Sequence, residues 1–251
     1  MLYLWRRSAL TSCAAALLVA GLLTASAQAA GTLVADNRLL DVAAAASESG
    51  STTSNDPAPV VPVFGAMFDE VLDSLLQESL PLNRAEASAD ASQTSSFDAS
   101  PDFLTVIASG YSHSYGKINS FTGVNDAQSD SDSVFSIEFS VSAATPWSIS
   151  AGTDDEGSGS TGRVRLHPVG GDDIFILQGT GTLQDTASGV LDPGNYELIG
   201  EARTAAFVST DLASFQDREA AFNLEFRLVP EPASGVLMLL GCCALLRRRG
   251  A

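Results

Sequence analysis

Two histidines, His113 and His167, are the only imidazoles that the sequence offers for acid–base chemistry. A hydrolytic triad pairs a histidine with an activated nucleophile, and the sequence contains no G-x-S-x-G nucleophile motif. His113 alternates with Ser112 and Ser114 in a polar stretch, and His167 precedes Pro168 in a predicted turn. We therefore interpret both histidines as surface residues and predict that the protein is not an enzyme.

Carboxylates are the most abundant reactive groups, with 30 Asp and Glu against 13 Lys and Arg and a formal net charge of -17. Two carboxylates about 5 to 10 Å apart are sufficient for glycoside hydrolysis. A sequence places no such pair in space, so a glycan-active enzyme stays a hypothesis without a motif. Nucleic acid is excluded as a partner, because binding to it depends on basic residues that neutralise phosphates.

Three acidic segments have the oxygen-rich character that Ca²⁺ prefers, although none follows the residue order of an EF-hand. The alternative for each segment is a solvated acidic loop. We therefore predict no cofactor, with calcium as the open alternative. The candidate ligands are Asn125, Asp126, Asp130 and Asp132, then Asp154, Asp155 and Glu156, and then Asp172 and Asp173.

Aromatic side chains that stack on sugar rings are the remaining candidates for a binding site. The five considered are Tyr111, Tyr115, Phe121, Trp147 and Tyr196. The alternative is that they belong to the core. We favour the core for Trp147, because it follows Pro146 and begins a predicted strand.

Short segments of alternating polarity dominate the sequence after residue 84 and predict the elements that position these side chains. Gly, Asn, Asp and Pro separate the segments, as in the turn Asp192-Pro193-Gly194. A weaker alternation in residues 85–92 fits either a strand or a flexible tract. The clearer strands are predicted at residues 103–109, 134–141, 147–151, 163–167, 174–178, 196–207 and 221–228. The sequence therefore predicts a mainly β protein, an antiparallel β-sandwich. The turn from Leu191 to Tyr196 before a long strand is similar to that of many PEP-CTERM exoproteins, and this resemblance implies a jelly-roll-like body.

Two segments before these strands have a different pattern. Residues 43–62 are rich in small and polar residues without an apolar period, so we predict a flexible arm over residues 30–63. Residues 64–80 place Phe64, Met67, Val71 and Leu75 at helical spacing and predict one amphipathic helix that ends at Pro81. Its apolar stripe would pack on the sheet, with a membrane or a partner as the alternative. The helix and the sandwich together form a domain over residues 64–229.

The amino end has the layout of a secretory signal peptide over residues 1–29. Arg6 and Arg7 precede an apolar run from Ala14 to Leu23, and Ala27 and Ala29 complete an A-x-A cleavage site. The apolar run is about half of the roughly 20 residues that a membrane span needs. We therefore predict cleavage by signal peptidase after Ala29, and secretion by the Sec route.

The carboxyl end, residues 230–251, combines three parts in a fixed order. Pro230, Glu231 and Pro232 form a rigid motif that continues neither a strand nor a helix. The 14 residues from Ala233 to Leu246 would reach about 21 Å as a helix, against a hydrocarbon core of about 30 Å. Arg247, Arg248 and Arg249 then act as a cytoplasmic stop. This order suits a short transmembrane helix that holds a secreted protein in the membrane until it is cut.

The VPEP motif, the short apolar helix and the terminal RRR resemble the PEP-CTERM sorting signal of Gram-negative bacteria. The resemblance covers residues 229–251. It implies that Pro230, Glu231 and Pro232 are recognised by an exosortase, a membrane protease or transpeptidase. It also implies that the protein passes through the inner membrane to the cell surface or extracellular matrix, often together with exopolysaccharide. The alternative is an ordinary tail anchor with a chance pair of prolines.

The three cysteines, Cys13, Cys242 and Cys243, all lie in these two ends. The mature body therefore has no disulfide, thiolate zinc site or cysteine nucleophile. We interpret the protein as a non-enzymatic surface or matrix protein associated with exopolysaccharide or biofilm. The alternative function is a secreted carbohydrate- or calcium-binding module, with extracellular polysaccharide as the partner.

Overall fold

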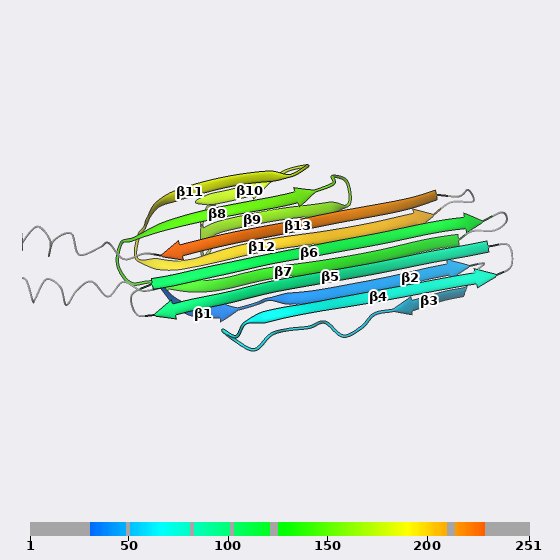
Figure 1. The fold of residues 1–251 in the computed structure, drawn as a ribbon, viewed down its shortest axis with the longest axis horizontal. Coiled ribbons are helices and arrows are strands. Elements are labelled where there is room, and N and C mark those ends of the chain that lie inside the picture. The colour runs from blue at the N-terminus through cyan, green and yellow to red at the C-terminus, as the bar shows by residue number, and fades with distance from the viewer. Residues whose placement is uncertain are drawn as a thin grey trace, which may run out of the picture.

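The computed structural model describes residues 31–48, 51–80, 83–100, 103–120, 125–209 and 214–228. They form 13 strands in two antiparallel sheets that face each other, as Figure 1 shows. The predicted β-sandwich is therefore confirmed. The predicted signal peptide, the sorting tail and Phe121 lie outside the described residues. Among the described residues, no helix is long and apolar enough to span a membrane.

The first sheet, called sheet A, has the strand order β10-β9-β12-β7-β2-β3, and β1 pairs with β7 beyond the end of β2. Its strands are β1 (Gly31–Asp36), β2 (Leu39–Glu48), β3 (Ser51–Asn55), β7 (Asn125–Val141), β9 (Ser160–Pro168), β10 (Phe175–Gln178) and β12 (Gly194–Ser209).

The second sheet, called sheet B, has the order β11-β8-β13-β6-β5-β4. Its strands are β4 (Phe68–Leu80), β5 (Asn83–Ser100), β6 (Phe103–Ser120), β8 (Thr145–Asp155), β11 (Leu183–Leu191) and β13 (Ser214–Leu228). The long strands run the length of the molecule, whereas β8 to β11 cover only one end of it (Figure 1).

The end covered by β8 to β11 contains a core of large side chains, and we call it the aromatic half. Phe139 contacts the rings of Tyr196 and Phe226, at 5.8 and 5.3 Å between ring centroids. Phe222 fits beneath two glycines, because a Cβ at Gly110 would lie 2.2 Å from its ring and one at Gly200 would lie 2.4 Å from it. Because the inward residues of these strands are large and apolar, their alternation with polar residues predicted the strands from the sequence.

The opposite end has an interior of small residues, and we call it the serine–alanine half. Ala85, Ala87, Ala89 and Ala91 face inward from β5, and each is at most 1% exposed. The other sheet and β6 contribute inward serines, which are Ser112, Ser114, Ser129, Ser131 and Ser133. The weak alternation at residues 85–92 is therefore a strand whose apolar residues are all alanine.

The predicted helix at residues 64–80 is wrong, because residues 68–80 form β4. Phe68 and Ser74 face the interior, while Val71 and Leu75 lie on the outer face. An edge strand with apolar residues on both faces matches the i, i+3, i+4 spacing of a helix as well as the period of two. Its pairing with β5 from Phe68 to Leu80 provides backbone partners that the sequence pattern did not reveal.

The predicted arm at residues 30–63 is also wrong for most of its length. Residues 31–36, 39–48 and 51–55 are strands β1, β2 and β3. Leu40, Val42, Ala44 and Ala46 alternate into the interior with at most 2% exposure. Alanine has a low β-propensity and little apolar contrast with serine, so the alternation of Ala44 and Ala46 was too weak to predict a strand.

Candidate ligand-binding site

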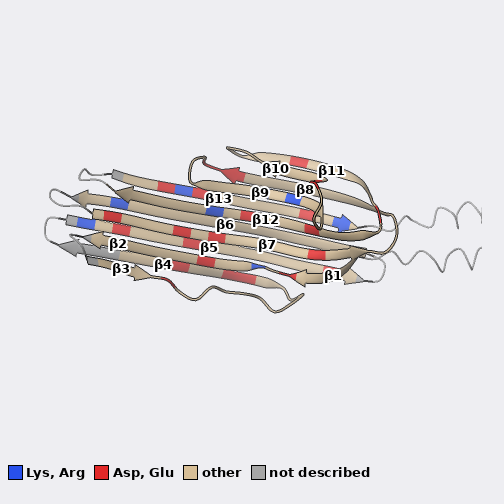
Figure 2. Ribbon diagram, turned by 180° about the vertical axis from the view of Figure 1, so that it is seen from behind, with Lys and Arg blue, Asp and Glu red and all other residues tan. Residues whose placement is uncertain are grey.

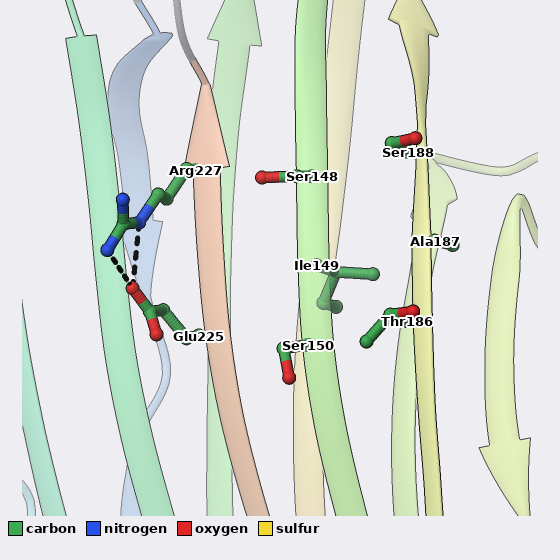
Figure 3. A pocket seen from close by; sticks show the side chains of 8 residues that line it. All are labelled: Ser148, Ile149, Ser150, Thr186, Ala187, Ser188, Glu225 and Arg227. Atoms are coloured by element: carbon green, nitrogen blue, oxygen red, sulfur yellow. Dashed lines mark hydrogen bonds and ion pairs between the residues drawn. The ribbon is translucent and has the colours of Figure 1, made fainter.

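A shallow groove lies on the outer face of sheet B in the aromatic half, over β11, β8 and β13 (Figure 3). Its volume is about 450 Å³, and a second hollow of about 340 Å³ continues it, since both are lined by Ser150 and Thr186. The side chains come from neighbouring strands at the same levels of the ladder. The sandwich therefore presents one continuous polar surface along these strands.

The ladder register arranges the groove as three successive rows that cross β11, β8 and β13. The first row is Ser188, Ser148 and Arg227, and the second is Thr186, Ser150 and Glu225. The third is Gln184, Gly152 and Asn223, in which the side-chain amide of Asn223 lies over Gly152, 2.7 Å from where a Cβ would stand. Rows on one face of a sheet are about 6.8 Å apart, because alternate residues of a strand share a face. The groove therefore repeats its polar groups at a regular interval.

The polar groups of the groove are available to a ligand. Within the part of the chain that the structure describes, the hydroxyls of Ser148, Ser150, Thr186 and Ser188 have no hydrogen-bond partner. Among the described residues that line the groove, the one side-chain pair joins Arg227 and Glu225, and Nε of Arg227 donates to Oε1 of Glu225 at 2.7 Å (Figure 3). This pair compensates one negative charge, and the carboxylate of Asp185 adds another in the second hollow. The groove can therefore bind a polyhydroxylated ligand through hydrogen bonds.

His113 is held by two carboxylates on the outer face of sheet B. Its Nδ1 lies 2.7 Å from Oδ2 of Asp90, and its Nε2 lies 2.8 Å from Oδ1 of Asp217. These residues belong to β6, β5 and β13, so the imidazole links three strands. Burial lowers the pKa of His113, but the hydrogen bonds to Asp90 and Asp217 outweigh it and leave the pKa above its ordinary value.

Both histidines are partly exposed, and each lies against a carboxylate that the sequence did not reveal. The side chain of His113 is 22% exposed, and that of His167 is 12% exposed. His167 lies 3.4 Å from Oε2 of Glu197 and 3.0 Å from the carbonyl oxygen of Pro168. The acidic partners of His113 come from strands distant in sequence, which is why sequence reasoning missed this cluster.

The candidate aromatic residues divide between core and surface. Trp147 and Tyr196 are each 6% exposed and belong to the core, which confirms the prediction for Trp147. Tyr111 and Tyr115 lie on the outer face of β6, on either side of His113 in the alternation of that strand. Burial and the carboxylate of Glu219 raise the pKa of Tyr111 well above its ordinary value. Only these two of the described candidates can face a ligand.

The calcium candidates lie apart, and several have structural partners. Asp155 accepts hydrogen bonds from the backbone of Gly157 at 2.6 Å and from the hydroxyl of Ser160 at 2.7 Å, which fixes the turn from β8 to β9. Asp173 pairs with Arg165.

Asp126, Asp130 and Asp132 lie in β7 and not in a loop, while Asp154 lies in β8 and Asp172 is an exposed residue before β10. Burial raises the pKa of Asp132, which lies 3.9 Å from Arg203. In the described ranges, no three His, Cys, Asp or Glu side chains are grouped to hold a metal ion.

The fully buried arginine, Arg38, is a further feature that the sequence did not predict. It donates from Nε to Oδ1 of Asp36 at 2.7 Å and from Nη1 to Oγ of Ser95 at 2.9 Å. Its guanidinium also lies over the rings of Phe97 and Phe68, at 4.8 and 5.6 Å from their centroids. All of these contacts are internal, so Arg38 joins the two sheets and is not a ligand site.

Comparisons with known proteins give no family. No family model matches the sequence, and a search of curated proteins finds no match. Among solved structures, a complex of TmCBM61 with β-1,4-galactotriose is similar at a TM-score of 0.22 and 10% identity, over 55% of this chain and 88% of that chain.

Two further structures are similar over larger parts of this chain. The GH31 α-xylosidase of Xanthomonas citri has a TM-score of 0.20 and 9% identity, over 82% of this chain and 37% of that chain. The infectious bursal disease virus, Gt strain, has a TM-score of 0.16 and 10% identity, over 79% of this chain and 67% of that chain. TM-scores this low carry no argument about function, so a proposal of function depends on the residues of this chain.

Proposed function

We propose that the protein is an exported, non-enzymatic surface or matrix protein that is sorted through a PEP-CTERM tail by an exosortase-type enzyme. The observation that carries this proposal is the order of parts in residues 229–251. A rigid Pro-Glu-Pro motif is followed by a short apolar segment and three arginines, and a signal-peptide pattern precedes the body.

The geometry of the sandwich supports this proposal. Gly31 and Leu228 are the first and last described residues, and a Cβ at Gly31 would lie 2.6 Å from Cδ1 of Leu228. The chain therefore enters and leaves the sandwich at the same place, in the aromatic half. A body attached in this way would remain tethered by its tail at one end, with the serine–alanine half pointing away from the membrane.

The acidic charge of the body is compatible with an exported protein. The acidic residues number 30, and 29 of them lie between residues 31 and 229. Figure 2 shows them distributed over both sheets. A strong net charge keeps a released protein soluble, and it repels acidic polysaccharide unless cations intervene.

A test of sorting uses the full chain in a bacterium that contains an exosortase. Replacing Pro230 and Glu231 by alanine should leave the protein in the inner membrane, whereas the unaltered chain should reach the surface or the medium. The control is Pro59→Ala, which changes an exposed proline of the body. Surface delivery of the Pro230 and Glu231 variant at the level of the unaltered chain would contradict the proposal.

A second candidate function is a polysaccharide-binding module, and the groove on sheet B favours it. The hydroxyls of Ser148, Ser150, Thr186 and Ser188, the amides of Gln184 and Asn223 and the carboxylate of Asp185 offer donors and acceptors. Such groups fit the hydroxyls of a neutral glycan. Tyr111 and Tyr115 lie further along the same sheet and would extend the surface.

Retention of the folded body on neutral polysaccharides tests this second function. Ser150→Leu with Thr186→Leu should reduce retention at least tenfold, while Ser54→Leu on the exposed strand β3 should not change it. A chelator should have no effect if the groove binds the glycan directly. Loss of retention with a chelator would instead favour the acidic candidates and calcium.

A further inference from the structure

The sandwich has four outer edges, and one of them is unusual. Sheet A ends on one side in β10, which has 4 residues, and on the other in β3, which has 5 residues, and β1, which has 6. Sheet B ends in β11, with 9 residues, and in β4, with 13 residues. An edge strand presents unpaired backbone groups, and proteins usually keep such strands short. The longest edge of the described chain is therefore the most capable of pairing with another strand (Figure 1).

Exposed apolar side chains accompany the edge of β4. Val71 is 71% exposed and Leu75 is 65% exposed, and both lie on the outer face of β4. The segment that leads into β4 adds Met67, at 74%, and Phe64, at 58%. A monomeric soluble protein rarely leaves large apolar residues together on its surface unless they contact something.

The inner face of β4 is already covered, so only its edge and outer face are free to bind. Phe68 is 4% exposed within a small core that includes Leu40 and Val42. The hydroxyl of Ser74 donates to the carbonyl oxygen of Asn55 in β3 at 2.9 Å. Within the described ranges, β4 pairs only with β5. Its other side therefore offers a backbone edge on a strand that is held in place.

Charge decides what kind of strand this edge accepts. Asp69, Glu70 and Asp73 lie in the described part of β4, and residues 61–80 contain no Lys or Arg. On the outer face, Asp69, Val71, Asp73 and Leu75 alternate acidic and apolar side chains. A second copy of the chain would bring its own acidic residues against these, and like charges on neighbouring strands are destabilising.

We propose that β4 receives an extended segment of another protein by strand addition, and that this segment alternates basic and apolar residues along one face. Backbone hydrogen bonds to the free edge would supply affinity, as in other cases of β-strand addition. Basic side chains of the segment would pair with Asp69 and Asp73, and its apolar side chains would contact Val71 and Leu75. This partner is independent of the groove and of the proposed sorting.

The test uses a fluorescent peptide with the sequence KTVTKTVTK, which places Lys and Val alternately on one face. It should bind the folded protein saturably in fluorescence anisotropy, and hydrogen exchange should slow at the amides of residues 68–76. A peptide of the same sequence with N-methyl groups on both edges keeps its charge but cannot pair. It should bind at least tenfold more weakly.

Matched protein variants separate strand addition from general attraction to an acidic protein. Val71→Lys with Leu75→Lys should weaken peptide binding at least tenfold. The control is Val190→Lys with Ile176→Lys, which adds the same charge at the exposed apolar residues of β11 and β10. This control should change binding less than threefold.

Three outcomes would overturn the proposal. Equal binding of the N-methylated peptide would show that charge alone attracts it, and unchanged exchange at β4 would show that it binds elsewhere. Sedimentation of the free protein as a dimer that dissociates on Val71→Lys with Leu75→Lys would assign the edge to a second copy. Unaltered folding of each variant is checked by its far-UV circular dichroism.

Discussion

The aromatic half and the serine–alanine half separate the same two sheets in different ways. In the aromatic half, Phe139, Phe222 and Phe226 fill the space between the sheets and bury large apolar surfaces. In the serine–alanine half, short side chains leave almost no such space. There the hydroxyl of Ser131 donates to the carbonyl oxygen of Asp90 in the opposite sheet at 2.6 Å, and that of Ser133 donates to Ser92 at 2.9 Å.

Hydroxyl contacts of this kind occur in both directions across the serine–alanine half. Ser112 of sheet B donates to the carbonyl oxygen of Ser131 at 2.6 Å, and Ser129 of sheet A donates to that of Tyr115 at 3.0 Å. A serine side chain is short, so the backbones here are closer than the ~10 Å usual between stacked sheets. The difference teaches that one sandwich can be stabilised by apolar burial at one end and by close-packed hydroxyls at the other.

Removing a large side chain from the aromatic half should have the largest effect on stability. Phe139 is fully buried and contacts two other rings, so Phe139→Ala should lower the free energy of unfolding by about 3–5 kcal/mol. Urea denaturation measures this change. Phe207→Ala, at a residue 54% exposed on β12, is the control and should cost less than about 1 kcal/mol. Equal effects of the two changes would contradict the packed aromatic core.

Enlarging a buried side chain should destabilise the serine–alanine half. The side chains there are already small, so truncating one would change little. Ala89 is 1% exposed between the closely spaced sheets, so Ala89→Leu should cost about 1–3 kcal/mol by forcing them apart. The control is Ser88→Leu, because the side chain of Ser88 lies on the outer face of the same strand. This change should alter the free energy of unfolding by less than about 0.5 kcal/mol. If Ala89→Leu leaves the free energy of unfolding unchanged, the two sheets are not closely packed at this position.

Removing one inter-sheet hydroxyl should have a smaller effect. Ser131→Ala deletes the hydrogen bond to Asp90 and should lower the free energy of unfolding by about 1 kcal/mol. Ser140→Ala, on the outer face of the same strand, is the comparison and should be nearly neutral. If both variants unfold at the same urea concentration as the unaltered protein, the hydroxyl contacts contribute nothing to the serine–alanine half.

The smallest predicted effect is a pH dependence on the outer face of that half. The pKa of His113 is raised in the folded state, so its protonated form is stabilised by folding. Its contribution is fully present below the unfolded value of about 6.5 and is lost as pH rises through the folded value. Urea midpoints at several pH values measure this loss, and His113→Gln should remove it. A stability that rises over that window because of His113 would have the wrong sign.

The two halves also differ in how far the sequence predicts them. Phe135, Ile137 and Phe139 alternate with polar residues, and they led directly to the strand at residues 134–141. In the serine–alanine half, inward serines look polar and inward alanines look weakly apolar. Residues 43–62 therefore suggested an arm, although β2 and β3 lie there. Hydrophobic patterning predicts a strand only where the buried residues are large.

The candidate sites were predictable to a smaller extent than the fold. The groove depends on Ser148, Thr186 and Glu225, which come from three strands and become neighbours only through the ladder register. Ordinary serines and threonines give no signal in a sequence. The sequence made Asp155 a calcium candidate, but in the structure its carboxylate stabilises the turn from β8 to β9. The sorting motif at residues 230–232 lies outside the described residues, and the prediction made from it stands on the sequence.

The most direct test of the proposed function is intact-mass spectrometry of the protein recovered from the cell surface and the medium. The account predicts a chain that begins at Ala30, after removal of the signal peptide, and that has lost Arg247, Arg248 and Arg249. Recovery of a surface chain that still carries these three arginines would contradict processing of the tail.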